Sequence, residues 1–251
     1  MRWLTSAESA GGGNNEKGEG ELMTNQQIMS IAMRQSALDL NADISDFTKE
    51  ENVFVKSGLG ALARKYYKEP IACNFVSYGS NVVASVKDEY KEMVKEYLRK
   101  FEFYHCFETP NMHWLDERMR EQGQRVCFMA EYFLPDANSL KRLSCQYEFK
   151  VLTQKDFDSL YLPIWSNALC EARKELDVLG VGAYDNGKLI GLAGCSADCD
   201  DMWQIGVDVL PEYRRKAIAS ALTSNLAVEI IERGKVPFYC CAWSNIRSAK
   251  N

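Results

Sequence analysis

The sequence predicts an α/β protein (α+β) in which a mixed sheet with flanking helices is preceded by a smaller α/β lobe. Residues 202–243 have the proportions of a strand, a helix and a second strand, and such a crossover makes the two strands parallel. Just upstream, Asp185-Asn186-Gly187 separates two apolar runs, a pattern typical of a β-hairpin. In the first half, apolar residues from Val86 to Phe101 recur at helical spacing.

Composition limits the classes of partner. The chain has 251 residues, of which 46% are hydrophobic, enough for one large or two modest domains. A net charge of -5 argues against a protein that coats nucleic acid or a membrane surface, because both need surplus cations. No stretch approaches the ~20 consecutive apolar residues of a membrane span. We therefore predict no nucleic-acid partner and no membrane partner.

The cysteines predict a reducing compartment. Their number is nine and therefore odd, and no apolar signal segment precedes them, so we expect reduced thiols in a cytoplasmic protein. Cys195 and Cys199 resemble half of a metal site, but no second Cys/His pair at ligand spacing follows. No metal site is predicted.

The chain divides into three predicted parts. Residues 1–22 are Gly- and Glu-rich and predict a disordered leader, residues 23–145 an N-terminal α/β lobe, and residues 146–251 a second domain. Within the lobe, the patterns predict helices over 25–40, from Ser85 to Phe101 and from Thr109 to Gly123, and strands over 101–107 and 126–133. Pro135 and the polar residues after it predict the linker.

Two features of the lobe admit a functional and a structural interpretation. Gly58-Leu59-Gly60 with Ala63 partly matches a dinucleotide fingerprint, but the next extended run does not end in the acidic residue that holds a ribose. The alternative, which we favour, is a turn leading into a helix. His105 precedes Cys106 in a predicted strand, where neighbours point to opposite faces, so we predict structural roles for His105 and His113.

The second domain contains the informative segment. Strands are predicted over 147–152, 179–184, 188–193, 202–209 and 236–243. Helices are predicted over 157–173, either continuous or split at Pro163, and over 217–232. Arg214, Arg215 and Lys216 precede the second helix, although the positive end of a helix dipole favours acidic residues. An anion such as a diphosphate would suit this turn. Alternatively, the cations are solvated or paired with Glu212 and nearby acids.

The residues from Val207 to Ala219 resemble the acetyl-CoA signature of the GNAT superfamily, Arg/Gln-x-x-Gly-x-Gly/Ala after a strand and a Pro-containing turn. Arg214 matches the first position of that signature and Ala219 the last. The hairpin over 180–194 resembles the second and third strands of the family, and the segment from Trp243 to Ser248 resembles its Asn-x-x-Ser/Ala step.

This resemblance implies an N-acetyltransferase that moves an acetyl group from acetyl-CoA directly to an amine, either of a small molecule or of a protein. It implies that the backbone from Val207 to Val209 pairs with the pantetheine arm, and that Asn245 and Ser248 border the thiol. The implied diphosphate site follows the strand and comprises Arg214, Arg215, Lys216, Ala217, Ile218, Ala219 and Ser220.

Two departures from the family pattern favour a second hypothesis. Ala217 occupies the position of a family glycine, and the chain ends at Asn251, a few residues into the expected fourth helix. We therefore expect a C-terminally truncated domain, and as the alternative a catalytically impaired acyl-CoA-binding or interaction module.

A general base is predicted on the strand over 202–209. Gln204, Gly206 and Asp208 share one face of that strand, and the missing side chain of Gly206 leaves room beside Asp208. Asp208 is therefore the candidate base, with Asp200 and Asp201 as others. The alternative for Asp208 is a solvated or helix-capping carboxylate.

Overall fold

The computed structural model describes residues 23–251, which form two compact units. One unit contains residues 32–130, and the other contains residues 131–251 together with the start of helix α1 (Asn25–Leu40). The predicted leader, residues 1–22, lies outside the described residues. Among those residues, no helix is long and apolar enough to cross a membrane.

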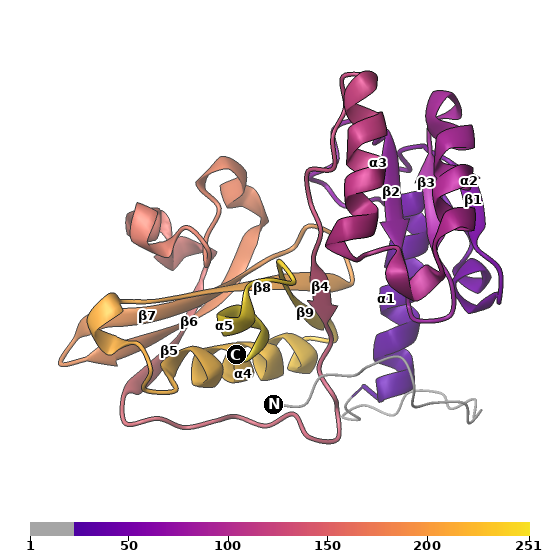
Figure 1. Ribbon diagram of the computed structural model, residues 1–251. Helices are drawn as coiled ribbons and strands as arrows, with labels where there is room; N and C mark the ends of the chain where they lie inside the picture. The colour runs from indigo at the N-terminus through magenta and orange to yellow at the C-terminus, as the bar shows by residue number, and fades with distance from the viewer. Residues whose placement is uncertain (1–22) are drawn as a thin grey trace. The chain divides into compact units, whose positions relative to one another are not determined.

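The unit of residues 32–130 has a three-stranded sheet, the C-terminal part of α1 and two further helices (Figure 1). Strand β3 (Val83–Val86) lies between β1 (Val53–Lys56), which is parallel to it, and β2 (Cys73–Val76), which is antiparallel. Helices α2 (Lys91–Lys100) and α3 (Thr109–Glu121) complete the unit. The core contains buried side chains from β3 and both helices: Val82, Ala84, Val86, Tyr90, Val94, Tyr97, Leu98, Leu115 and Met119.

Two elements predicted between Ser85 and Phe107 are wrong. The helix predicted from Ser85 begins only at Lys91, because residues 83–86 pair with two neighbouring strands. The strand predicted over 101–107 is absent, and a 3₁₀ turn over Phe103–His105 leads into α3 instead. Aromatic residues favour strands only where a partner strand is available, whereas here the Tyr97 hydroxyl donates to the Cys106 carbonyl at 2.6 Å and fixes a turn.

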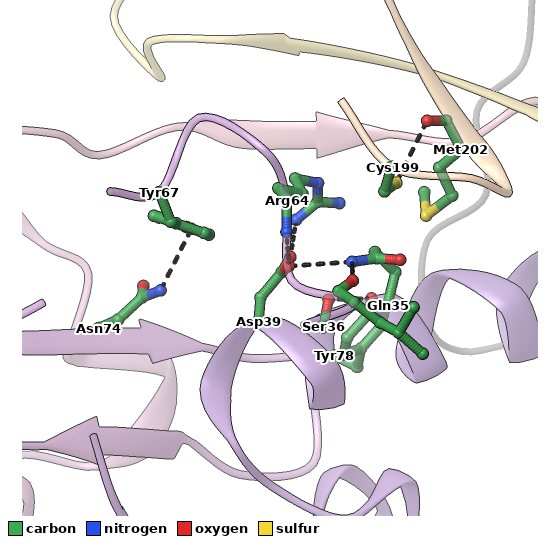
Figure 2. Close-up of polar contacts among 10 residues, drawn as sticks. Gln35, Ser36, Asp39, Arg64, Tyr67, Asn74, Tyr78, Cys199 and Met202 are labelled. Carbon is green, nitrogen blue, oxygen red and sulfur yellow. Dashed lines mark hydrogen bonds and ion pairs between the residues drawn. The ribbon is translucent and has the colours of Figure 1, made fainter. Parts of the chain in front are cut away.

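A buried ion pair closes the loop that follows the glycine-rich segment 58–60 (Figure 2). The Asp39 carboxylate binds the Arg64 guanidinium and also accepts hydrogen bonds from the Arg64 main-chain N–H at 2.8 Å and the Gln35 amide at 2.9 Å. Burial raises the pKa of Asp39, and the Arg64 charge opposes that rise. Residues 61–63 form turns rather than the expected helix, because the Asp39 carboxylate binds the main-chain N–H of the next residue, Arg64.

The unit of residues 131–251 contains a six-stranded mixed sheet, ordered β4-β9-β8-β7-β6-β5 (Figure 1). The strands are β4 (Glu131–Phe133), β5 (Glu148–Thr153), β6 (Asp177–Asp185), β7 (Lys188–Ser196), β8 (Met202–Val209) and β9 (Val236–Cys241). Only β8 and β9 pair in parallel. The predicted fold class is therefore confirmed. The strand predicted over 126–133 is shorter and joins this sheet beside β9.

Local signals predicted the hairpin and the crossover correctly. Asn186 and Gly187 join β6 to β7 with φ of 48° and 83°, the left-handed values that such a turn requires. Helix α4 (Ile218–Glu232) connects β8 to β9 and buries the predicted stripe of Ile218, Leu222, Leu226 and Ile230. Gly234, with φ of 73°, ends the helix as expected.

The two faces of this sheet have different coverings. A Cβ on Gly191 would touch Leu222 and Ile218, so α4 packs on that face. A Cβ on Gly194 would meet the Ala168 carbonyl, so residues near 168 cover the opposite face. The helix predicted over 157–173 is wrong, because this covering consists of four 3₁₀ turns: Gln154–Asp156, Asp158–Leu160, Pro163–Trp165 and Glu171–Leu176. Pro163 starts one of them, as its missing N–H allows.

Candidate functional site

The site begins where β8 and β9 separate. Their register runs from the pair Met202 and Val236 to the pair Ile205 and Tyr239, and no later residues of the two strands are paired. Residues 206–209 continue β8 along β7 only. At the point of separation the Gln204 side-chain amide donates to the Cys240 sulfur at 3.2 Å. The final residues of β8 therefore have an edge that β9 does not cover.

The turn after β8 brings the chain to α4 through an unusual backbone. Its first part is a 3₁₀ turn over Pro211–Tyr213, which the Arg214 side chain fixes by donating from Nε to the Val209 carbonyl at 3.0 Å. Arg215 and Ala217 then adopt left-handed conformations with φ of 62° and 57°. This region is strained for residues that carry a Cβ. Alternating left-handed residues can make the intervening main-chain N–H groups converge on an anion.

The main-chain N–H groups of this turn have no partner within the described chain. Among residues 23–251, no group accepts a hydrogen bond from the N–H groups of residues 215–220, and the first main-chain bond at the start of α4 runs from the Ala221 N–H to the Ala217 carbonyl at 3.1 Å. The N-terminus of a helix carries partial positive charge and unsatisfied donors. Six such donors beside an uncovered strand edge suit an anionic ligand.

The three cations of the turn are also available to bind an anion. Glu212 pairs with Lys188 at 3.4 Å, and within residues 23–251 no carboxylate lies at ion-pair distance from Arg214, Arg215 or Lys216. Lys216 instead lies over the Tyr213 ring, 4.9 Å from its centroid, with its Nζ 3.4 Å from the Tyr147 hydroxyl. Glu212 thus forms its ion pair with Lys188 and not with these cations, which leaves solvated cations as the alternative to an anion site.

Tyr213 and Tyr147 form the contacts that hold the Lys216 side chain. Their rings meet edge to face at 5.8 Å, and the Tyr213 hydroxyl donates to Asp185, the last residue of β6, at 2.9 Å. This hydrogen bond to a carboxylate raises the pKa of the Tyr213 phenol. Sequence reasoning did not identify either tyrosine, because their contact joins positions 66 residues apart.

Val207 and Val209 lie on the α4 side of β8. Val207 is registered with Ala193, and Val209 with Gly191, whose Cβ position touches α4. The predicted role of their backbone beside a pantetheine arm stays a prediction. Their placement at the uncovered edge is compatible with it.

Asp208 points to the opposite face and is fully engaged. Its Oδ2 accepts the main-chain N–H groups of Asn167 and Ala168 at 2.9 and 3.0 Å, and its Oδ1 accepts the Asn167 side-chain amide at 2.6 Å. The expected room beside Gly206 is filled, since a Cβ there would lie 1.7 Å from the Asn167 carbonyl oxygen. The premise for a general base at Asp208 is thus wrong, although the role itself stays a prediction.

Asn245 and Ser248 lie at the helix that follows β9. Asn245 caps α5 (Ile246–Ala249) by accepting the Ser248 N–H at 3.3 Å. Burial raises the pKa of the nearby Tyr239 phenol, while a hydrogen bond with Ser248 opposes that rise. Tyr239 stands in the last parallel pair with β8. It lay inside an apolar run of the sequence, where nothing distinguished it from core.

The mixed sheet, the parallel crossover and the open cationic turn together define a protein of the GNAT fold. A family model described as GNAT acetyltransferase matches residues 85–250, and the chain belongs to this family. The predicted superfamily is therefore confirmed.

Solved structures with a similar fold include a protein described as a GNAT-family acetyltransferase from Novosphingobium aromaticivorans (18% identity, 48% of this chain and 56% of that one, TM-score 0.39). A second is a GCN5-related N-acetyltransferase-like protein from Streptococcus suis (20% identity, 55% of this chain and 60% of that one, TM-score 0.42). The chain thus spans little more than half the length of either protein. No curated protein sequence matches the chain significantly.

Proposed function

We propose that this chain binds acetyl-CoA and transfers its acetyl group directly to an amine, of a small molecule or of a protein. The observation that carries the proposal is the turn from Arg214 to Ser220. Among residues 23–251, its six main-chain N–H groups at residues 215–220 have no acceptor, and its three exposed cations have no carboxylate partner. A coenzyme diphosphate supplies the negative charge and the acceptor oxygens that such a turn lacks.

The proposed orientation of the coenzyme follows from the strand. With the diphosphate at residues 215–220, the pantetheine arm runs back along the uncovered edge from Val209 to Val207, and the thiol reaches the region bordered by Asn245 and Ser248. Extended arms pair readily with free strand edges, because the edge offers an unused row of donors and acceptors. The parting of β8 from β9 after Ile205 and Tyr239 supports this path.

The proposed chemistry needs no covalent intermediate on the protein. The amine nitrogen attacks the thioester carbonyl carbon, the carbon–sulfur bond breaks, and the nitrogen loses a proton as CoA leaves as its thiol. The protein contributes mainly by holding the two reactants in line and by polarising the carbonyl oxygen. We also keep the division into lobes of residues 23–145 and 146–251, and the cytoplasmic location, as proposals.

One observation favours the second candidate, an acyl-CoA-binding or interaction module without turnover. Ala217 is exposed and left-handed at the position of the family glycine, so its methyl group stands at the turn where phosphate oxygens would approach. This side chain weakens binding without abolishing the open N–H groups.

Calorimetric titration with acetyl-CoA, followed by CoA-thiol release across a panel of primary amines, tests both candidates. Binding with thiol release supports the transferase, and binding without release of thiol to any amine supports the module. Absence of binding to wild-type protein contradicts both.

A further inference from the structure

We infer that Asp208 is a positioning residue that fixes the chain segment 163–170 as the wall of the acceptor side of the site. This inference rests on the proposed function for the identity of the reaction. The positioning role of Asp208 itself is inferred from the geometry around β8.

The segment packs on a part of the sheet where both neighbouring strands carry glycine. Gly194 of β7 and Gly206 of β8 are registered directly opposite each other. A Cβ on Gly194 would lie 2.1 Å from the Ala168 carbonyl oxygen, and a Cβ on Gly206 would lie 1.7 Å from that of Asn167. The main chain of residues 167–168 therefore touches the sheet backbone, at a distance that only paired glycines permit.

Hydrogen bonds to the Asp208 carboxylate hold this contact in place. Its carboxylate accepts both main-chain N–H groups of residues 167 and 168 and the Asn167 side chain. The Ala168 N–H is shared with the Trp165 carbonyl at 3.1 Å, so the same carboxylate also orients the preceding 3₁₀ turn. Hydrogen bonds to an ionised acceptor are stronger than those between neutral groups.

The segment held by Asp208 covers the face of β8 opposite α4. Val207 and Val209 face α4, whose open N-terminus marks the donor side, whereas Gly206 and Asp208 face the segment. The proposed coenzyme arm runs along the edge of β8 with its diphosphate at the start of α4, so we place the amine on the side of this edge away from α4, where residues 163–170 form the wall. Leu162 and Ile164 on this covering are 51% and 46% exposed, which leaves apolar surface for an acceptor.

Matched substitutions separate positioning from general-base catalysis. In Asp208→Asn, the amide oxygen still accepts the two main-chain N–H groups, and the Asn167 amide can turn to accept from the new side chain. Asp208→Ala removes every acceptor. Asn167→Asp places two carboxylates together, and combining it with Asp208→Asn restores one acid and one amide. Asp156→Ala is the control, because Asp156 likewise accepts a main-chain N–H, that of Thr153 at 2.8 Å.

The experiment measures amide hydrogen exchange of residues 163–170 in each full-length variant, and thiol release with acetyl-CoA and the amine panel from pH 6 to 9. We expect Asp208→Ala and Asn167→Asp to speed exchange and slow thiol release about tenfold or more, with KM for acetyl-CoA nearly unchanged. Asp208→Asn and the double variant should stay within about threefold of wild type, with an unaltered pH profile. Asp156→Ala should leave exchange at 163–170 unchanged.

Two results would overturn the inference. One is unchanged exchange at residues 163–170 in Asp208→Ala. The other is an Asp208→Asn variant that keeps slow exchange but loses thiol release and the acid-side limb of the pH profile, the signature of a general base. If wild-type protein binds no acetyl-CoA, the proposed function fails, and the exchange measurements still decide whether Asp208 fastens the segment.

Discussion

Replacing Ala217 by glycine should stabilise the protein, in contrast to most glycine substitutions. Ala217 has φ of 57°, and a left-handed backbone costs a residue with a Cβ about 1–2 kcal/mol. Glycine removes this strain but adds about 0.4–1 kcal/mol of entropy to the unfolded chain. The net expectation is a gain of about 0.5–1 kcal/mol, or a few degrees in melting temperature for a chain of this size.

Ala219→Gly is the matched control, two residues further along the same turn. Ala219 lies in the first turn of α4, so glycine there should cost up to about 1 kcal/mol. Differential scanning calorimetry of both variants gives the comparison, and acetyl-CoA titration should show tighter binding only for Ala217→Gly. A loss of stability in Ala217→Gly equal to that in Ala219→Gly would refute the reasoning from backbone strain.

Three other substitutions test the unit of residues 131–251. Burial raises the pKa of Asp177 from 3.8 to about 6, so its favourable contribution is present below pH 4 and is lost as pH rises through 6. Asp177→Asn should therefore stabilise the protein by about 1–2 kcal/mol at pH 7.5, and urea titrations should show the gain shrink toward pH 4. Gly194→Ala should lower the free energy of unfolding in urea by about 3 kcal/mol, because its Cβ would overlap the Ala168 carbonyl. An unchanged free energy would mean that residues 167–168 do not pack against Gly194. Leu226→Ala, at a fully buried position of α4, should lower the unfolding free energy by about 2–5 kcal/mol, and a loss below 1 kcal/mol would contradict the described core.

Elements whose signals are local were predictable from the sequence. The Asn186-Gly187 turn, the stripe of α4 and the glycine that ends it each depend on residues within one or two turns of chain. The segment 157–173 was not predictable, because its conformation depends on the register that places Gly194 opposite Gly206. The two facing glycines leave room for the main chain of Asn167, which lies 41 positions before Asp208. No local periodicity of the sequence predicts this contact.

The candidate site divides in the same way. The cations at residues 214–216 stand out in the sequence because they oppose the helix dipole, and the structure leaves them without carboxylate partners among residues 23–251. The left-handed backbone of Arg215 and Ala217 could not be predicted, since residues with a Cβ rarely adopt it. Asp208 was singled out for the empty space beside it, and that space is filled by a distant segment.

The most direct test of the account is a titration of isotopically labelled protein with CoA, followed through the backbone amide resonances. The account predicts the largest chemical-shift changes at residues 215–220, with smaller changes along 207–209, because these N–H groups exchange water for phosphate and pantetheine oxygens. Saturable binding whose shifts leave residues 215–220 unmoved, or no binding, would contradict the claim that this turn holds the coenzyme diphosphate.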